Sequence, residues 1–277
     1  MIPGIDSYEG VKEELKFLTT SGVRIKLLIS LNNENMTMDQ FRDEFGYRTS
    51  TVLPVLAELK SKDLIYKDDR QYGVTPYGKL ISAKLIDFIE TLHMFKTQER
   101  FWKTHETYVI PDLFFRNIGS LSRSTIIEDM PADLFATHRH FTELLGDCEV
   151  VNGVTPFIHP DFPDIFRVFV ESGVVVRLIV TYPVLKLMCD RHKDVMQHVA
   201  DLQNFSLRVI NADVAVAFTV TEKLISLGFF RPDGTYDYGM DLISEDAAAI
   251  KWGNALFEYY WNQSADVTEQ DCTRLRD

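Results

Sequence analysis

The sequence of 277 residues has little cysteine, no excess of positive charge and no long apolar run. Its three cysteines, Cys148, Cys189 and Cys272, are widely spaced, and their odd number argues against a disulfide framework. Lys and Arg number 29 against 41 Asp and Glu, which gives a net charge of −12. This balance excludes a uniformly basic nucleic-acid coat, but a local DNA-contacting surface remains compatible with it.

Membrane and secretion signals are also lacking. The strongest apolar stretches, residues 174–180 and 214–220, are far shorter than the roughly 20 residues that a membrane span needs. The chain begins Met1-Ile2-Pro3-Gly4, without the basic and apolar segments of a signal peptide. We therefore expect a cytoplasmic protein with no membrane partner and no cofactor.

What is present is the composition of a folded protein, 45% hydrophobic and 25% charged, long enough for one or two domains. Residues 1–80 carry 11 Lys and Arg and 12 Asp and Glu, so nearly all the acidity belongs to the rest of the chain. This asymmetry favours two parts with different partners, although a merely soluble acidic surface explains it equally well. We expect domains at residues 1–78 and 104–277, joined by a helix over 79–103.

The first 80 residues predict a helix-turn-helix. Thr37 and Gln40 form a capping box, and Gly46 stands where a left-handed residue would end the short helix. A second helix follows with an apolar stripe over residues 52–59. Because proline fits a helix only in its first turn, Pro54 predicts that the N-cap of this helix lies near Thr51.

A wing follows the second helix. Residues 64–67 and 71–74 read as short strands joined by the turn at residues 68–70. Thr75-Pro76 then starts a further helix. The complete pattern predicts an α+β winged helix-turn-helix whose second helix enters the major groove of double-stranded DNA.

The predicted DNA contacts are hydroxyls and cations at the start of the second helix, at its end and on the wing. They are Arg48, Thr49, Ser50, Thr51, Lys62, Lys67 and Arg70. The helix itself carries few cations, so a winged helix that contacts protein instead of DNA is the alternative. The wing charges Lys67 and Arg70 are equally well explained as solvated turn residues.

Residues 23–28, 56–65 and 72–78 resemble the archaeal and bacterial winged-helix regulators of the ArsR/MarR type. The resemblance implies a DNA-binding domain. In that family the position of Pro54 usually carries a polar or basic residue that faces the groove. This departure affects the base-contacting set more than the fold.

Residues 77–103 read as one continuous helix with a broad apolar face and no internal Pro or Gly. Such a face needs a partner. Pairing with a second copy would make a homodimer, which suits duplex DNA because two half-sites then bind together. Packing on the chain's own C-terminal domain is the alternative.

From residue 104 short apolar strands alternate with helices, which predicts an α/β sheet covered on both faces. The expected strands are Thr125–Glu128, Glu149–Val151, Val174–Thr181, Ser206–Ile210, Val214–Val220 and Lys223–Phe229. The expected helices are Asp112–Ser120, Ala132–Leu145, Asp161–Ser172, Leu185–Leu202 and Glu245–Asn262, the last with Ser244 as its N-cap.

Five segments of this part resemble the domain that follows the winged helix in an archaeal family of methanogenesis and filament-formation regulators. They are residues 101–105, 110–111, 173–177, 239–244 and 249–260. The resemblance implies a transcription regulator whose second domain receives a signal. It also implies a sheet distantly similar to phospholipase D domains.

Phospholipase D chemistry needs a His followed two positions later by Lys, and none of the seven His has this spacing. The sequence also lacks the zinc-protease, nucleophile-elbow and Rossmann motifs. Residues 73–80 resemble a phosphate loop, but Leu80 replaces the hydroxyl residue that would hold magnesium. We therefore expect no enzyme; a divergent phosphodiesterase using His192 is the remaining catalytic alternative.

The C-terminal domain is expected to sense a small ligand or a protein partner. Arg177, Asp241, Lys251 and Tyr236 are the candidate ligand residues. The acidic residues Asp213 and Asp241 explain the two cations equally well as internal ion-pair partners. The aromatic residues around Tyr236 either line a pocket or fill the core beside a turn. Cys148 and Cys189 are redox sensors or buried apolar residues.

Overall fold

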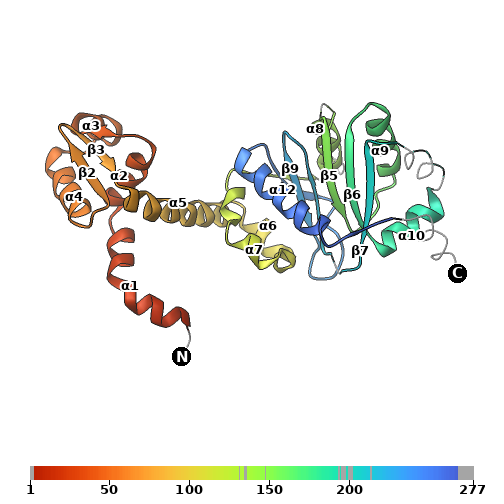
Figure 1. The fold of residues 1–277 in the computed structure, drawn as a ribbon, viewed down its shortest axis with the longest axis horizontal. Coiled ribbons are helices and arrows are strands. Elements are labelled where there is room, and N and C mark those ends of the chain that lie inside the picture. The colour runs from red at the N-terminus through yellow and green to blue at the C-terminus, as the bar shows by residue number, and fades with distance from the viewer. Residues whose placement is uncertain are drawn as a thin grey trace. The chain divides into compact units, whose positions relative to one another are not determined.

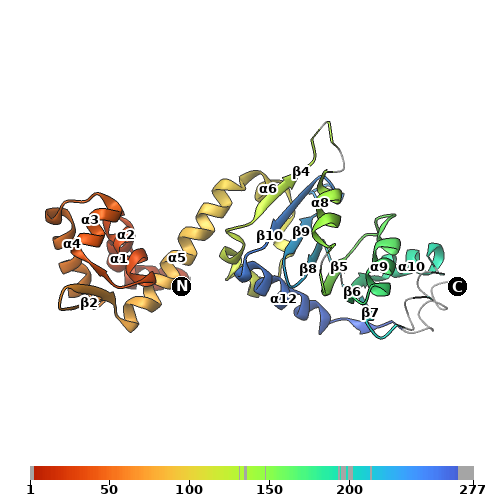
Figure 2. The same cartoon turned by 90° about the horizontal axis from the view of Figure 1, so that it is seen from above.

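The computed structural model describes residues 3–130, 132–133, 136–146, 148–192, 194, 198, 202–212 and 214–267. The chain divides into two compact units, residues 1–89 and 90–277, here called unit 1 and unit 2 (Figures 1 and 2). Each unit has its own core.

Unit 1 contains helices around a small antiparallel sheet with the strand order β1-β3-β2. Its elements are α1 (Pro3–Thr19), α2 (Gly22–Asn33), β1 (Met36–Thr37), α3 (Met38–Phe45), α4 (Thr49–Ser61), β2 (Ile65–Asp68), β3 (Gln71–Val74) and the beginning of α5 (Pro76–Thr97). This is the predicted order of helix, turn, helix, hairpin and helix. It is consistent with a winged-helix-like unit.

The local signals in the sequence explain the boundaries of these elements. Thr37 accepts a hydrogen bond from the backbone of Gln40, whose side chain accepts one from the backbone of Thr37, so the predicted capping box is confirmed. Gly46 has φ +67°, as a left-handed C-cap requires. Thr75 caps α5 by accepting a hydrogen bond of 2.9 Å from the amide of Gly78.

The predicted N-cap of α4 near Thr51 is wrong. The helix begins at Thr49 with Arg48 as its N-cap, and Pro54 lies inside it. The burial of Val52, Leu56 and Leu59 holds the helix in the core. Because Pro54 has no N–H, it cannot donate the helical hydrogen bond to Ser50, which is exposed and keeps access to water.

Gly78 brings the beginning of α5 against the wing. A Cβ atom at this position would lie 1.8 Å from the carbonyl oxygen of Leu64. Only glycine permits this approach, which places the helix directly beside the strand that follows Leu64.

The predicted continuous helix over 77–103 is interrupted. α5 ends at Thr97, and α6 (Glu99–Thr104) begins after Gln98. The buried side chain of Gln98 donates a hydrogen bond of 2.7 Å to the carbonyl oxygen of Ser124 and accepts one of 3.0 Å from the indole of Trp102. These hydrogen bonds hold the chain in the interrupted conformation at Gln98. The spacing of apolar residues along the helix does not predict them.

Unit 2 is built on an eight-stranded mixed sheet with the order β11-β7-β6-β5-β8-β9-β10-β4. The strands are β4 (Thr125–Glu128), β5 (Val150–Thr155), β6 (Val175–Thr181), β7 (Phe205–Ile210), β8 (Val216–Val220), β9 (Ile225–Phe229), β10 (Met240–Ser244) and β11 (Ala265–Asp266). β5, β6 and β7 are parallel neighbours, whereas β8, β9, β10 and β4 pair antiparallel.

Helices cover both faces of this sheet. The further helical elements are η1 (Thr107–Val109), α7 (Asp112–Phe115), η2 (Ile118–Leu121), α8 (Ala136–Leu144), α9 (Phe162–Glu171), α10 (Tyr182–Arg191) and α12 (Ala247–Trp261). Trp252, Leu256 and Phe257 of α12 pack on one face with the region of α6 to η2. α9 and α10 pack on the opposite face. Figure 1 shows α12 lying across the sheet.

The expected α/β class therefore holds only in part, since five of the seven strand pairings in the described sheet are antiparallel. The apolar pattern does not predict β10, because Asp241 interrupts a short apolar run, and it does not predict β11. Ser244 is the last residue of β10, and Asp246 is the N-cap of α12, so the predicted cap is wrong. The predicted helix at 112–120 is two short elements, and most of 192–201 lies outside the described residues.

Among the described residues, no helix is long and apolar enough to cross a membrane. Cys148 is a buried thiol. Cys189 is disulfide-bonded. The odd number of cysteines therefore did not exclude a disulfide at this residue. Cys272 lies outside the described residues.

Candidate nucleic-acid interface and ligand cavity

The N-terminal end of α4 is exposed and polar. Arg48, Thr49, Ser50 and Thr51 all lie at the surface, and Arg48 makes no side-chain cap. The N-terminal amides of a helix carry partial positive charge, which favours a phosphate at this end. This end of α4 can therefore accept a nucleic-acid backbone without rearrangement of the core.

The outward face further along α4 is weakly polar. Leu53, Pro54 and Ala57 are exposed at helical spacing, and Leu53 keeps 47% of its surface. Such a face can contact thymine methyl groups, but it offers few hydrogen bonds to base edges. It is equally suited to a protein surface.

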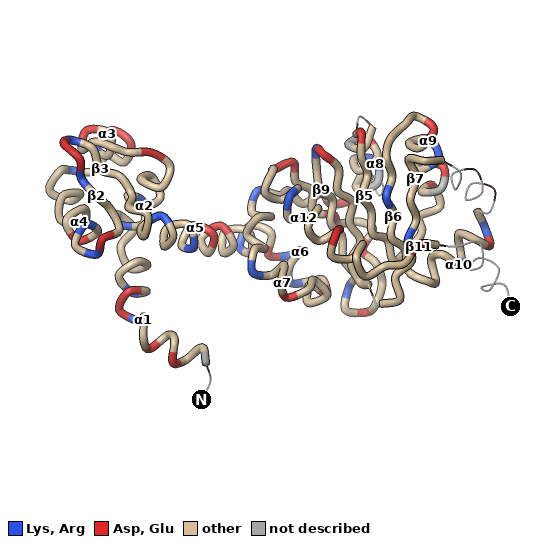
Figure 3. Tube along the Cα trace, in the orientation of Figure 1, with Lys and Arg blue, Asp and Glu red and all other residues tan. Residues whose placement is uncertain are grey.

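Cations flank this face at the end of α4 and on the wing. Lys62, Lys67 and Arg70 are exposed. The ammonium of Lys62 lies 5.5 Å from the ring centre of Phe17, and that of Lys67 lies 5.5 Å from that of Tyr72. Aromatic support limits the freedom of both side chains while their charges stay near solvent. Figure 3 shows Lys and Arg interspersed with Asp and Glu over unit 1.

A further cation of unit 1, Arg24, is held inside the unit. Arg24 is nearly buried and donates to the carboxylate of Glu58 on α4 and to the carbonyl oxygen of Phe17 on α1. Its guanidinium lies 3.8 Å from the ring centre of Phe17. Arg24 therefore joins α1, α2 and α4, and it is not available to DNA.

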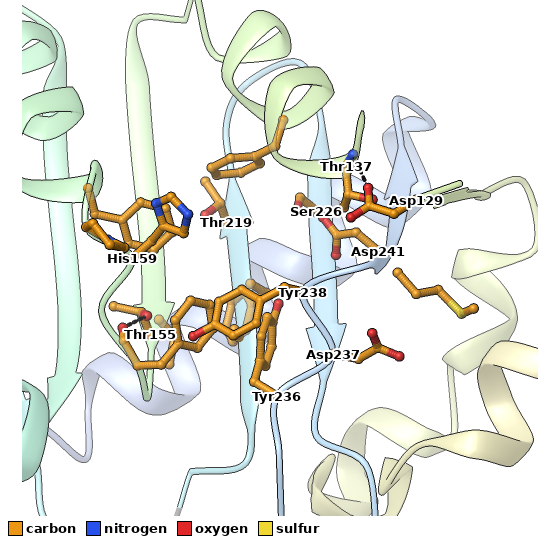
Figure 4. Close-up of a pocket in the computed structure, with 18 residues that line it drawn as sticks. Asp129, Thr137, Thr155, His159, Thr219, Ser226, Tyr236, Asp237, Tyr238 and Asp241 are labelled. Carbon is orange, nitrogen blue, oxygen red and sulfur yellow. Dashed lines mark hydrogen bonds between the residues drawn. The ribbon is translucent and has the colours of Figure 1, made fainter. Parts of the chain in front are cut away.

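Unit 2 contains a cavity of about 330 Å³ over the junction of the parallel and antiparallel halves of the sheet (Figure 4). Its floor is formed by β5, β8, β9 and β10, and α8 and the segment after β5 contribute to its walls. The floor includes the small residues Ala217, Thr219 and Ser226, which leave the space open. The lining residues are Asp129, Thr137, Phe141, Val154, Thr155, Phe157, His159, Pro160, Phe162, Ala217, Phe218, Thr219, Ser226, Tyr236, Asp237, Tyr238, Met240 and Asp241.

Asp241 is the buried charge of this cavity. The hydroxyl of Ser226 donates a hydrogen bond to its Oδ2 atom, whereas its Oδ1 atom has no hydrogen-bond partner. Burial raises the pKa of the Asp241 carboxyl to about 7, against the stabilising hydrogen bonds from Ser226 and the backbone of Leu242. An unsatisfied buried carboxylate oxygen is a point where a ligand with a donor group would gain free energy.

Three aromatic rings form one wall. The ring centres of Phe157 and Tyr236 are 4.0 Å apart, and Tyr238 lies 5.0 Å from each of them. Burial raises the pKa of both tyrosine hydroxyls, so the phenols are neutral at physiological pH. The hydroxyl of Tyr236 approaches the sheet at Gly228, where a Cβ atom would lie 2.1 Å from it.

The other buried acid beside the cavity, Asp237, already has partners. Arg231 donates two hydrogen bonds to it, of 2.7 and 3.0 Å, and Nε2 of His105 lies 3.1 Å from its Oδ2 atom. The guanidinium of Arg231 opposes the effect of burial and holds the pKa of the Asp237 carboxyl below its usual value. Asp237 is therefore a fixed, paired charge, in contrast to Asp241.

The structure brings together two of the four expected ligand residues, Asp241 and Tyr236. Arg177 lies elsewhere: it bonds Glu258 at 2.7 Å and stacks 4.1 Å from the ring centre of Trp261. Lys251 is exposed on α12 and does not line the cavity. Asp213, considered as an ion-pair partner, lies outside the described residues.

Sequence reasoning misses several lining residues, including Asp129, Phe157 and His159. The available signal is weak: a short aromatic run directly after an apolar strand, at residues 157–162. Ligands of α/β sheets often bind beyond the carboxyl end of a strand, and this run follows β5. Its neighbours in the cavity on β8, β9 and β10 are about 55 to 85 residues away in the sequence.

Comparison with known proteins gives matches along most of the chain. Residues 12–93 match the profile of the methanogenesis regulatory protein FilR1, N-terminal domain, and residues 134–263 match that of its middle domain. The chain is thus similar to FilR1-type regulators. The FilR1-type part of the expected resemblance is supported, and the ArsR/MarR part is not confirmed.

One curated relative is the methanogenesis regulatory protein FilR1 of Methanothrix harundinacea (strain 6Ac), 27% identical over 275 residues. The alignment covers 98% of this chain and 61% of the relative, so the chain spans about three fifths of the relative's length.

A solved structure, of the archaeal chromatin protein TrmBL2, is titled as showing a novel mode of DNA binding. It has 12% identity and a TM-score of 0.43, and the match covers 87% of this chain and 91% of that one. A likeness of this size supports no inference about function.

Proposed function

We propose that this protein is a transcription regulator that binds double-stranded DNA through unit 1 and senses a small ligand through unit 2. The similarity to FilR1-type regulators supports the regulatory role. The exposed polar start of α4 and the exposed side chains of Lys67 and Arg70 on the wing support DNA as the partner of unit 1. The absence of a catalytic motif in the sequence favours sensing over turnover.

The observation that carries the DNA proposal is the exposure of Arg48 at the start of α4 and of Lys67 and Arg70 on the wing. In this proposal these cations contact phosphates, and the α4 face supplies the contacts to base edges. Base specificity then comes more from hydroxyls and apolar contact than from charge. A homodimer would present two such faces to the two half-sites of an operator.

A gel-shift titration with fragments that include the promoter of its own gene tests this proposal at several salt concentrations. The slope of log affinity against log salt should become shallower by about 1 for every phosphate that a variant no longer neutralises. Arg70→Ala and Lys67→Ala should therefore weaken binding to all sequences and flatten the slope. Arg123→Ala is the control, because Arg123 pairs with Asp246 in unit 2. Absence of binding even at low salt would refute the proposal.

A protein-binding winged helix is the second candidate. It is favoured by one observation, the exposed and uncharged face of Leu53, Pro54 and Ala57. Leu53→Arg distinguishes the two functions. The added cation should strengthen DNA binding if this face meets the duplex, and it should abolish an association that depends on an apolar face.

A further inference from the structure

We infer that the cavity of unit 2 takes a small organic cation, an amine with an aromatic or apolar body, whose ammonium group binds Oδ1 of Asp241. This inference deepens the proposed sensing role and rests on it. Three features of the cavity carry it: an orphaned carboxylate oxygen, a set of lining charges with one sign, and an aromatic wall.

The orphaned oxygen defines where the ligand's polar group binds. Asp241 keeps only 7% of its surface, and Oδ1 is fully buried and unbonded while Oδ2 is held by Ser226. Leaving a charged acceptor unsatisfied in such a place is costly. Because Oδ1 has no accessible surface, a ligand N–H reaches it when a neighbouring side chain shifts, and it then removes this cost and forms a charge-assisted hydrogen bond.

The sign of the charge defines the class of ligand. Asp129, Asp237 and Asp241 line the cavity, and no Lys or Arg is found among its described lining residues. Asp237 is neutralised by Arg231, which leaves Asp129 and Asp241 as the charges offered to a ligand. An anionic ligand would meet repulsion from these carboxylates and would find hydroxyl groups and His159 but no Lys or Arg in the described lining, so the field favours a cation.

The aromatic wall distinguishes an organic cation from a metal ion. Phe157, Tyr236 and Tyr238 line the cavity and pack against one another, and aromatic rings attract ammonium groups and pack against apolar bodies. A metal ion would need several oxygen or nitrogen ligands converging on one point. No group of three or more potential metal-binding side chains occurs in the described part of the chain. Figure 4 shows Asp241 on the sheet near Ser226, with the two tyrosines beside it.

The cavity volume sets the size of the ligand. A space of about 330 Å³ is at the lower end for small-molecule sites and corresponds to an arylalkylamine more than to a nucleotide. The test therefore uses benzylamine, phenethylamine and tryptamine as probes. Each is compared with the alcohol and the carboxylic acid of the same carbon skeleton.

Binding of these probes to the full chain without DNA is measured by titration calorimetry and by the shift of thermal unfolding. We expect at least one amine to bind at least about tenfold more tightly than its alcohol, because the alcohol cannot form the charge-assisted bond. The carboxylic acids should not bind. Failure of all three amines, equal binding of the alcohols, or preference for a neutral compound such as glucose would overturn the inference.

Two variants locate the site. Asp241→Asn keeps the shape of the side chain and should reduce the preference for amine over alcohol to within about twofold. Tyr238→Leu removes one ring at a half-exposed position, so the fold is retained while the amine affinity falls severalfold. Asp233→Asn, which removes a charge from an exposed turn outside the cavity, should bind amines as the wild type does. An unchanged amine preference in Asp241→Asn would overturn the assignment to Asp241.

The outcomes separate this inference from the proposed function. If an amine binds but the DNA affinity stays the same, the ligand class stands and the coupling to DNA fails. If DNA binds and no amine does, the regulator stands and the ligand class fails.

Discussion

Ser226 donates a hydrogen bond to one carboxylate oxygen of Asp241, and the other oxygen is buried without a partner. The two residues lie on neighbouring strands, β9 and β10, on the face of the sheet that forms the cavity floor. The protein thus supplies a hydrogen-bond donor for Oδ2 of Asp241 and none for Oδ1. The burial of this carboxyl makes the unfolding free energy depend on pH even when no ligand is bound.

The first prediction concerns pH. Burial raises the pKa of Asp241 from 3.8 to about 7, so between these values the folded state binds more protons than the unfolded state at this site. The contribution of Asp241 to stability is therefore lost as pH rises from about 4 to 7, and it stays lost above 7. At 1.36 kcal/mol per unit, this loss is at most about 4 kcal/mol.

Asp241→Asn removes this titration. Relative to the wild type, the variant should gain up to about 4 kcal/mol in unfolding free energy between about pH 4 and pH 8, measured by urea denaturation. Asp233→Asn is the matched control and should show no such gain, because its pKa is lowered by hydrogen bonds from Thr235. A difference between Asp241→Asn and wild type that does not vary with pH would contradict the assignment.

The second prediction concerns Arg24, which joins α1, α2 and α4 in unit 1. Arg24→Met keeps the length of the side chain and its contact with Phe17, but it removes the hydrogen bonds to Glu58 and to the Phe17 carbonyl. The expected loss of unfolding free energy is about 1–3 kcal/mol. Glu58→Gln should lose less than about 1 kcal/mol, since Glu58 is half exposed and Arg24 keeps its other acceptor. If the two variants lose equal amounts of unfolding free energy, then the ion pair with Glu58, and not the hydrogen bond to Phe17, holds the three helices together.

Unit 1 can be predicted well because its boundaries depend on neighbouring residues. The capping box at Thr37, the left-handed Gly46 and the cap at Thr75 are all encoded within four positions. The predicted start of α4 is misplaced because a buried apolar stripe outweighs the preference of Pro54 for the first turn.

Unit 2 is less predictable because its deciding contacts are distant in sequence. The break at Gln98 depends on Ser124, and the orphaned oxygen of Asp241 depends on how β9 and β10 align. A turn rich in aromatic residues points to Tyr236, but Phe157 joins it only through the fold. The sequence leaves Arg177 either as a ligand residue or as an ion-pair partner of Asp213 or Asp241, and it does not point to the actual partner, Glu258, which lies 81 residues away.

The third prediction concerns Pro54. Alanine at this position restores an N–H group that can donate to the carbonyl of Ser50 within α4. Pro54→Ala should raise the unfolding free energy by about 1–2 kcal/mol, a gain partly offset by the greater freedom of the unfolded chain. Leu53→Ala, next to it and also exposed, should change stability by less than about 0.5 kcal/mol. A loss of stability in Pro54→Ala would show that the ring has packing contacts that outweigh the hydrogen bond.

The fourth prediction concerns the proposed homodimer. α1 carries Ile5, Tyr8, Val11 and Leu15 on one side, and all of them are exposed. Their helical spacing makes a continuous apolar stripe. A stripe of this kind on an exposed helix indicates a partner surface, and a second copy of the chain supplies a matching one.

Leu15→Glu places a charge in the middle of this stripe, so it should shift the protein from dimer to monomer. Sedimentation velocity or light scattering after size exclusion measures the change. Glu13→Gln lies on the other side of α1 and should leave the dimer intact. Because two half-sites bind together only in a dimer, Leu15→Glu should also weaken DNA binding more on a palindromic site than on a single half-site. If the wild type is already monomeric at micromolar concentration, or if Leu15→Glu remains dimeric, α1 is not the interface.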